Sequence, residues 1–283
     1  MTQFFYDMGD NPFLLTGLLA GLLASLACGV IGPYVVTRRI VFLSGAIAHM
    51  AVGGVGAAIW LAAVFPETMG WFRPLYGAIL VSLAAAVLIG LIHQRVVERM
   101  DTLIGALWAV GMAVGLLLIK FTPGYQTELM SYLFGNIAFV AWRQVWVIVA
   151  LDVIILATVL VAHKRLLAIC LDQQQAELQG VPVLATNILL LCLVALTVIA
   201  LTQIVGLILV IALVSLPAAT AAHHVARVPS MMFVGTLLSA LVTTLPRIAV
   251  YGTSISAEPA IVLAAACLYL LSVMVRRIRN RGG

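Results

Sequence analysis

Residues 183–222 read VLATNILLLCLVALTVIALTQIVGLILVIALVSLPAATAA, an apolar run without a charged side chain. An α-helix rises 1.5 Å per residue, so one helix of this length would be about 60 Å long, roughly twice the hydrocarbon thickness of a bilayer. Gln203 and Gly206 lie near its middle and offer a place to turn. The run therefore predicts two membrane-spanning helices packed as a tight pair.

The composition of the whole chain has the same character. Charged residues make up 9% of the 283 positions and hydrophobic residues 64%, whereas a soluble domain is about a quarter charged and about half apolar. So few charges could not cover a surface that faces water, and lipid removes that need. The composition therefore predicts an integral membrane protein and excludes an ordinary soluble fold.

Apolar runs of about 20 residues, the length that a helix needs to cross a bilayer, recur along the chain. They predict an all-α, polytopic membrane protein that forms a single transmembrane domain over residues 1–283. The number of spans is nine, or eight if one helix of the pair in 183–222 does not cross fully. The predicted spans are about 13–36, 40–64, 74–93, 102–121, 143–163, 184–203, 205–222, 231–250 and 258–276.

The positions of Lys and Arg predict the orientation, because cytoplasmic loops are enriched in these residues. With the N-terminus outside and the C-terminus cytoplasmic, eleven basic residues lie on the cytoplasmic side and four outside. The net charge of +5 is then explained by membrane topology, and we expect no nucleic-acid partner. The cytoplasmic group is Arg38, Arg39, Arg95, Arg99, Lys164, Arg165, Arg227, Arg276, Arg277, Arg279 and Arg281, and the outer group is Arg73, Lys120, Arg143 and Arg247.

The chain lacks the sequence signatures of an enzyme. It contains no Gly-x-x-x-x-Gly-Lys-Ser/Thr run for nucleotide phosphates and no His-Glu-x-x-His pair. We also find no convincing Ser/His or Asp/Asp set. The four cysteines show no metal or redox spacing. We therefore expect neither catalysis nor a permanently bound cofactor.

The cytoplasmic segment 164–182 contains the longest polar stretch of the chain. Asp172 is suited to cap a helix that starts after it, because its carboxylate can accept bonds from free N–H groups. Gly180 and then Pro182 supply the stop. We predict a short helix between two spans. It is either a solvated connection or a docking surface for a cytoplasmic partner.

Two ionisable side chains are predicted near the middle of the membrane. His49 lies about nine residues into the second span, roughly 14 Å from its cytoplasmic end, and Asp152 lies at a similar depth in the fifth. Such residues are costly in lipid and mark functional sites by default. Imidazole binds zinc and other borderline divalent ions. We therefore predict His49 and Asp152 as metal ligands, the alternative being hydrogen bonding within the bundle.

Several motifs along the chain resemble the permease subunits of ATP-binding-cassette importers for zinc, manganese and iron. The resemblance extends from about residue 13 to residue 276. The segments that carry it are LSGAIAHMAVGGV at 43–55, DTLIG at 101–105 leading into GMAVG at 111–115, LFGNI at 133–137, the polar stretch 172–180, VGLILVIALVSLPAATA at 205–221 and SAEPAIVL at 256–263.

The resemblance implies a type II ABC importer-like permease in the plasma (inner) membrane of a prokaryote. It also implies a homodimer in the lipid bilayer that works with cytoplasmic ATPase subunits and an external metal-binding protein. The cargo would be a divalent cation (zinc, manganese or iron). The polar helix would insert into the ATPase through Asp172, Gln174, Gln175, Ala176, Glu177 and Gly180.

The chain departs from the family pattern at a ligand position. The family commonly carries a metal-coordinating Asp four residues before the histidine, and Gly45 stands there in this chain. Glu258 likewise occupies a position where the family commonly has Gly. The loss of the Asp leaves Asp152 as a candidate replacement. Two other transport functions stay open, an ABC importer for a metal chelate and a secondary transporter that uses no ATP.

Overall fold

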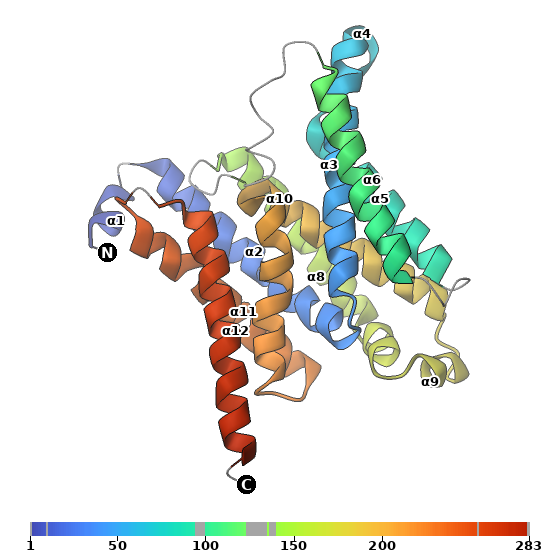
Figure 1. Cartoon of the computed structure of the whole chain (residues 1–283), viewed down its shortest axis with the longest axis vertical. Coiled ribbons are helices and arrows are strands. Elements are labelled where there is room, and N and C mark those ends of the chain that lie inside the picture. The colour runs from blue at the N-terminus through green and yellow to red at the C-terminus, as the bar shows by residue number, and fades with distance from the viewer. Residues whose placement is uncertain are drawn as a thin grey trace.

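The computed structural model describes residues 2–9, 11–93, 100–122, 135, 140–253 and 255–281, and these ranges contain helices and no strand. Of the predicted external motif at 133–137, only Gly135 falls within them. The helices are α1 Thr2–Asp7, α2 Pro12–Thr37, α3 Val41–Val64, α4 Pro66–Met69, α5 Pro74–His93, α6 Met100–Lys120, α8 Trp142–Leu171, α9 Gln173–Leu178, α10 Val183–Ala222, α11 Val228–Val250 and α12 Ala257–Arg281 (Figure 1).

The described part of the chain contains eight helices that are long and apolar enough to cross a membrane, and the second half of α10 is a shorter apolar helix over Leu209–Ala222. This confirms the prediction of an all-α membrane protein with eight or nine spans. The eight long segments are Pro12–Thr37, Val41–Val64, Pro74–Ile92, Thr102–Lys120, Trp142–Leu171, Val183–Thr202, Val228–Val250 and Ala257–Arg279.

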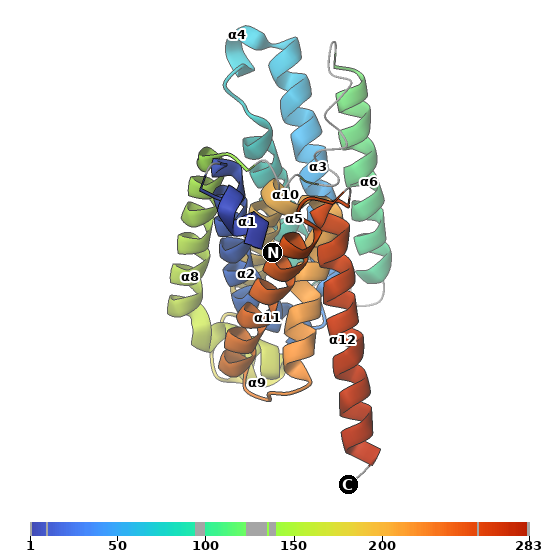
Figure 2. The ribbon, with the colours of Figure 1, turned by 90° about the vertical axis from the view of Figure 1, so that its left-hand side faces the viewer.

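The helix α10 is broken at Gly206, as the length of the apolar run predicted. Gly206 has φ 75° and ψ 173°, a conformation that is open to glycine and strained for residues with a Cβ. Beyond this residue the second half of α10 runs back toward the end of the molecule that holds α9 (Figures 1 and 2). One glycine thus divides a run that is too long for one span into a pair.

Helix α10 forms the centre of the bundle, where it contacts α2, α3, α5, α8, α11 and α12. Elsewhere, glycines bring helix backbones together. A Cβ added to Gly54 of α3 would overlap the carbonyl oxygen of Gly77 on α5, and one added to Gly56 would overlap that of Gly115 on α6. Small residues permit such close approach in membrane helices. Helices α3, α5 and α6 therefore pack as a tight group.

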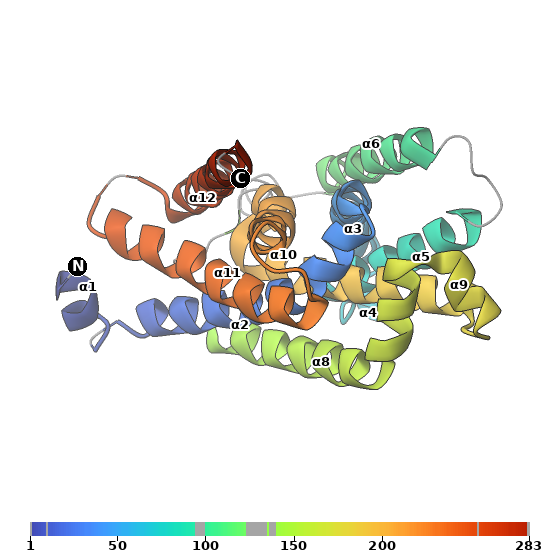
Figure 3. The same ribbon diagram turned by 90° about the horizontal axis from the view of Figure 1, so that it is seen from below.

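The outermost helices differ in how much of their surface the chain itself covers. Only 22% of the span in α6 and 22% of the span in α12 is buried, against 61% in α2. Figures 2 and 3 show α6 and α12 on one side of the bundle and α8 on the other. The exposed faces of α6 and α12 are therefore available to lipid or to another subunit.

Candidate functional site

His49 lies on α3, where its half-buried side chain faces α6. Its Nδ1 atom is 3.2 Å from the Sδ atom of Met112. Its ring lies 4.6 Å, centroid to centroid, from the indole of Trp108, and the two planes are inclined by 30°. Trp108 and Met112 are four residues apart and so share one face of α6. An imidazole nitrogen and a thioether sulfur thus lie together within a membrane-spanning segment.

Trp108 occupies the space next to Gly45, one helical turn before His49. A Cβ added to Gly45 would lie 2.6 Å from Cζ3 and 2.8 Å from Cη2 of Trp108, and 3.0 Å from Cδ1 of Ile211. Any side chain at position 45 would therefore collide with the indole as it is placed here. The indole of Trp108 thus occupies the space that a carboxylate side chain at position 45 would need.

The donor set beside His49 differs from the carboxylate and histidine pair of the family. Thioethers are soft ligands and imidazole suits borderline cations, whereas oxygen ligands suit manganese. Among the described residues, no group of three or more His, Cys, Asp or Glu side chains could hold a metal ion. The polar contacts described for His49 are thus limited to Met112 and the ring of Trp108.

Asp152 lies on α8, and its side chain is 3% exposed. Neither of its carboxylate oxygens has a hydrogen-bond partner in the structure. A buried carboxylate without a donor is costly unless it is neutral or is reached by a cation or by water. Asp152 therefore remains a candidate for a polar site inside the helical bundle.

The structure does not bring His49 and Asp152 into one site within a subunit. Helix α3 packs against α5, α6 and α10, whereas α8 packs against α2, α9 and α10. The partners of His49 are on α6, which lies on the side of the bundle opposite α8 (Figures 2 and 3). If both residues contact a cation, they do so at different points.

The predicted polar helix is present as α9, Gln173–Leu178. The Asp172 carboxylate accepts hydrogen bonds from the backbone N–H groups of Gln174, at 2.9 Å, and Gln175, at 3.0 Å. Gly180 ends the segment with a φ of 77°, which favours glycine. The predicted start and stop are therefore both confirmed.

Helix α9 has a buried side and an exposed side. Ala176 is 2% exposed and belongs to the main hydrophobic core. Gln174, Gln175 and Glu177 are exposed, and Leu178 is 89% exposed. Ala176 thus anchors the helix, while the polar side chains and one large apolar side chain remain free to contact a partner.

Sequence reasoning missed Trp108 and Met112. Their periodicity on α6 was visible, but nothing in the sequence shows which helix they face. The spacing that the sequence does reveal, four residues between Gly45 and His49, concerns one helix only. The contact between α3 and α6 is a tertiary contact, and only the structure shows it.

Comparisons with known proteins agree with the fold. The sequence model of the ABC 3 transport family matches residues 10–276. The chain is 40% identical to an uncharacterized membrane protein of Synechocystis sp., over 94% of this chain and 91% of that protein. It is 36% identical to a probable metal transport system membrane protein of Chlamydia muridarum, over 95% of this chain and 91% of that protein.

A solved structure is similar over nearly the whole chain. PsaBC from Streptococcus pneumoniae, in complex with Fab, matches with a TM-score of 0.83 and 28% identity, over 96% of this chain and 94% of that chain. The fold, the span count and the family match thus agree with the resemblance that the motifs predicted, and the chain belongs to the ABC 3 transport family.

Proposed function

We propose that this chain is the membrane-spanning permease subunit of an ATP-driven importer for a divalent metal cation. The family match over residues 10–276 is the observation that carries the proposal. Relatives add to it, because the 36% identical protein of Chlamydia muridarum is named as a probable metal transport system membrane protein. A protein of Halalkalibacterium halodurans that is 29% identical, over 96% of this chain and 90% of its own length, is named for manganese transport.

His49 is the residue that we propose to contact the cation during its passage. It lies in the middle part of α3, where an ionisable group is costly unless it has a function. A single imidazole beside a thioether binds a divalent ion weakly. Weak binding suits transport, because the cation must leave the site as well as enter it. We propose Asp152 as a second polar side chain on the path, which the cation contacts at a different point from His49.

The cargo that the ligands beside His49 favour is a borderline cation such as Zn²⁺ or Fe²⁺ rather than Mn²⁺. The described donors there are the Nδ1 of His49 and the Sδ of Met112. Manganese prefers oxygen ligands, and the space that an oxygen-bearing side chain at position 45 would need is filled by Trp108. The choice among zinc, iron and manganese therefore depends on the surroundings of His49.

The remaining parts of the importer are proposed to be separate proteins. Two ATPase subunits would dock at the end of the molecule that holds α9, which we place in the cytoplasm with the C-terminus. An external metal-binding protein would deliver the cation at the opposite end, near α4. A second copy of the chain would cover part of the exposed side formed by α6 and α12, which the chain itself buries least.

Removing the polar side chains of α9 tests the docking of the ATPase. We expect the combined change Gln174→Ala, Gln175→Ala and Glu177→Ala to weaken ATPase binding at least about tenfold, the effect of about 1.4 kcal/mol. Alanine favours the helix, and the Asp172 cap and buried Ala176 are retained. The measurement is co-purification of the ATPase with the permease at increasing salt.

A matched control changes exposed residues at the other end. Glu67→Ala and Thr68→Ala lie on α4, and we expect them to leave ATPase binding as it is. Helix content by circular dichroism should be unchanged in both variants. If the α9 variant retains the ATPase as well as the control does, α9 is not the docking element.

A further inference from the structure

The side chain of Arg38 joins the ends of four helices. Arg38 follows α2, and its Nη1 donates to the carbonyl oxygen of Ile169 in the last turn of α8, at 2.9 Å. Its Nη2 donates to Oε1 of Gln173, the first residue of α9, at 3.2 Å and to Oδ1 of Asn187 on α10 at 2.9 Å. One guanidinium therefore connects the polar helix α9 to the membrane-spanning helices.

The connection from Arg38 to α3 is short and stiff. The N–H of Ile40 donates to the carbonyl of Val35 at 3.0 Å, and that of Arg39 donates to Val36 at 3.1 Å. Together with the left-handed φ of 58° at Arg39, these two bonds form a Schellman motif. Helix α3 then begins at Val41. Only Arg39 and Ile40 therefore separate Arg38 from the start of the helix that carries His49.

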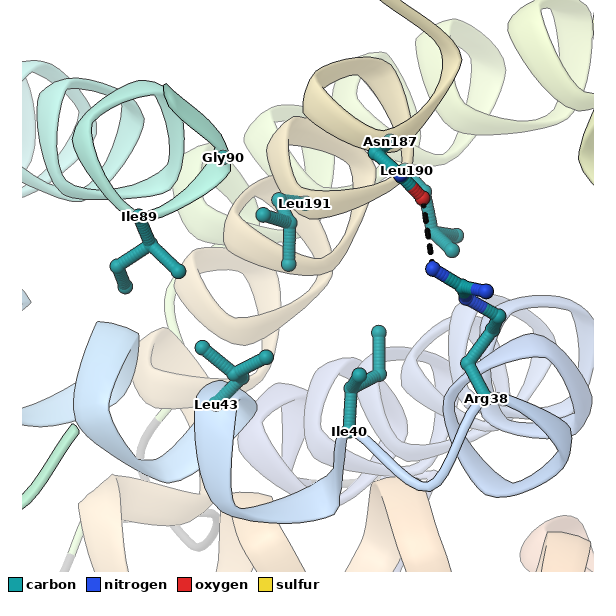
Figure 4. A pocket seen from close by; sticks show the side chains of 8 residues that line it. All are labelled: Arg38, Ile40, Leu43, Ile89, Gly90, Asn187, Leu190 and Leu191. Atoms are coloured by element: carbon teal, nitrogen blue, oxygen red, sulfur yellow. Dashed lines mark hydrogen bonds between the residues drawn. The ribbon is translucent and has the colours of Figure 1, made fainter. Parts of the chain in front are cut away.

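A small pocket lies beside Arg38, next to the first turn of α3. Its volume of about 20 Å³ has room for roughly one water molecule. It is lined mainly by apolar side chains of the α2–α3 turn, α3, α5 and α10. Figure 4 shows Leu43 of α3 and Leu191 of α10 on its walls, with Arg38 bonded to Asn187 at its edge. The first turn of α3 therefore faces α10 across a small pocket, at whose edge Arg38 is bonded to Asn187.

We propose that Arg38 is a positioning residue that transmits the movement of α9 to α3, and so links ATP hydrolysis to the surroundings of His49. This inference rests on the proposed function, in which α9 docks the ATPase. When the ATPase displaces α9, Gln173 moves with it. The guanidinium, held by Gln173 and by the end of α8, carries the α2–α3 turn along. The cation would then meet a different arrangement of α3 and α6.

The bonds of Arg38 exceed those that a residue serving only as a cap for the end of α8 would need. To cap the end of α8, Arg38 needs only its bond to the carbonyl of Ile169. The bonds to Gln173 and Asn187 add two side chains from two further helices. If Arg38 also transmits movement, losing these two bonds should lower the zinc taken up per ATP in variants that remain folded. This ratio separates the two roles in an experiment.

The test measures zinc uptake and ATP hydrolysis together in proteoliposomes that contain the permease, its ATPase and the external binding protein. The variants are Arg38→Met, which keeps an unbranched side chain and removes the guanidinium, and Gln173→Met and Asn187→Leu, which each remove one partner. We expect ATPase binding and ATP hydrolysis to persist in all three. Zinc taken up per ATP should fall at least about fivefold in Arg38→Met, the lower end of coupling between linked sites.

The matched control is Arg39→Asn, which removes a neighbouring exposed charge and keeps a residue that tolerates a left-handed backbone. Its uptake per ATP should equal that of the wild type. A wild-type ratio in Arg38→Met overturns the inference. If Arg38→Met does not fold, the two partner variants decide, because they keep the guanidinium and its bond to Ile169. Wild-type ratios in both then overturn it.

The outcomes also separate this inference from the proposed function. If the wild-type complex shows no ATP-dependent zinc uptake, the proposed function fails and the role of Arg38 fails with it. If the wild type couples ATP to uptake and the Arg38, Gln173 and Asn187 variants couple equally well, only the role of Arg38 is lost.

Discussion

Replacing His49 with alanine is expected to abolish cation uptake and to leave the helical bundle assembled. The imidazole is the one nitrogen ligand that we place on the cation path, and its partner there is the thioether of Met112. Changes to the surroundings of a metal ligand cost about 10–100-fold in metal affinity or activity, and loss of the ligand itself should cost at least as much. The measurement is zinc uptake into proteoliposomes that contain the complete importer.

The control removes an imidazole elsewhere. His224 lies just beyond α10, and its Nε2 is 2.9 Å from Oγ of Ser272, which His223 also contacts. We expect His224→Ala to transport zinc as the wild type does.

Asp152→Asn tests the second point of the path and should lower uptake. If His49→Ala and Asp152→Asn both leave the uptake of zinc, manganese and iron untouched, the path that we propose is wrong.

The pair Gly45→Asp and Trp108→Ala should change both stability and metal preference. Gly45→Asp alone places a Cβ within 2.6 Å of the indole, and such overpacking costs about 1–3 kcal/mol. Trp108→Ala removes the obstacle. The double variant should therefore fold better than Gly45→Asp alone and should carry a carboxylate one turn from His49. Because manganese prefers oxygen ligands, we expect its uptake to rise relative to that of zinc.

Thermal unfolding in detergent and competition between zinc and manganese during uptake measure the two effects. Gly105→Asp is the matched control for the unfolding measurement, because a Cβ at Gly105 of α6 meets nothing within 4 Å. It should unfold at nearly the wild-type temperature. Equal stability of Gly45→Asp with and without Trp108 would show that the indole does not fill this space. An unchanged preference in the double variant would show that position 45 does not select the metal.

The features that the sequence predicted well are local ones. Eight of the nine predicted apolar runs form helices long and apolar enough to cross a membrane, and the ninth forms the shorter helix Leu209–Ala222. The burial of apolar residues in lipid needs no information about neighbouring helices. The break at Gly206 and the helix after Asp172 were also predicted, since both depend on the chemistry of a few adjacent residues. In each case the physical cause lies within one segment of the chain.

The features that the sequence could not predict depend on which helices meet. Arg38 appeared only as a basic residue in a short loop, and its bonds to Ile169, Gln173 and Asn187 join residues more than a hundred positions apart. Trp108 was likewise an apolar residue on an apolar helix, until packing placed it against Gly45. These contacts arise from tertiary packing, and a single sequence does not record them.

Zinc accumulation by the wild-type permease tests the central claim most directly. The permease, its ATPase and the external binding protein would be placed in liposomes, with zinc outside and ATP on the side of α9. We predict that zinc accumulates inside only when ATP and both partners are present, and that zinc on the binding protein stimulates ATP hydrolysis. Zinc uptake that needs no ATP and follows a proton or sodium gradient would contradict the proposed function and favour a secondary transporter.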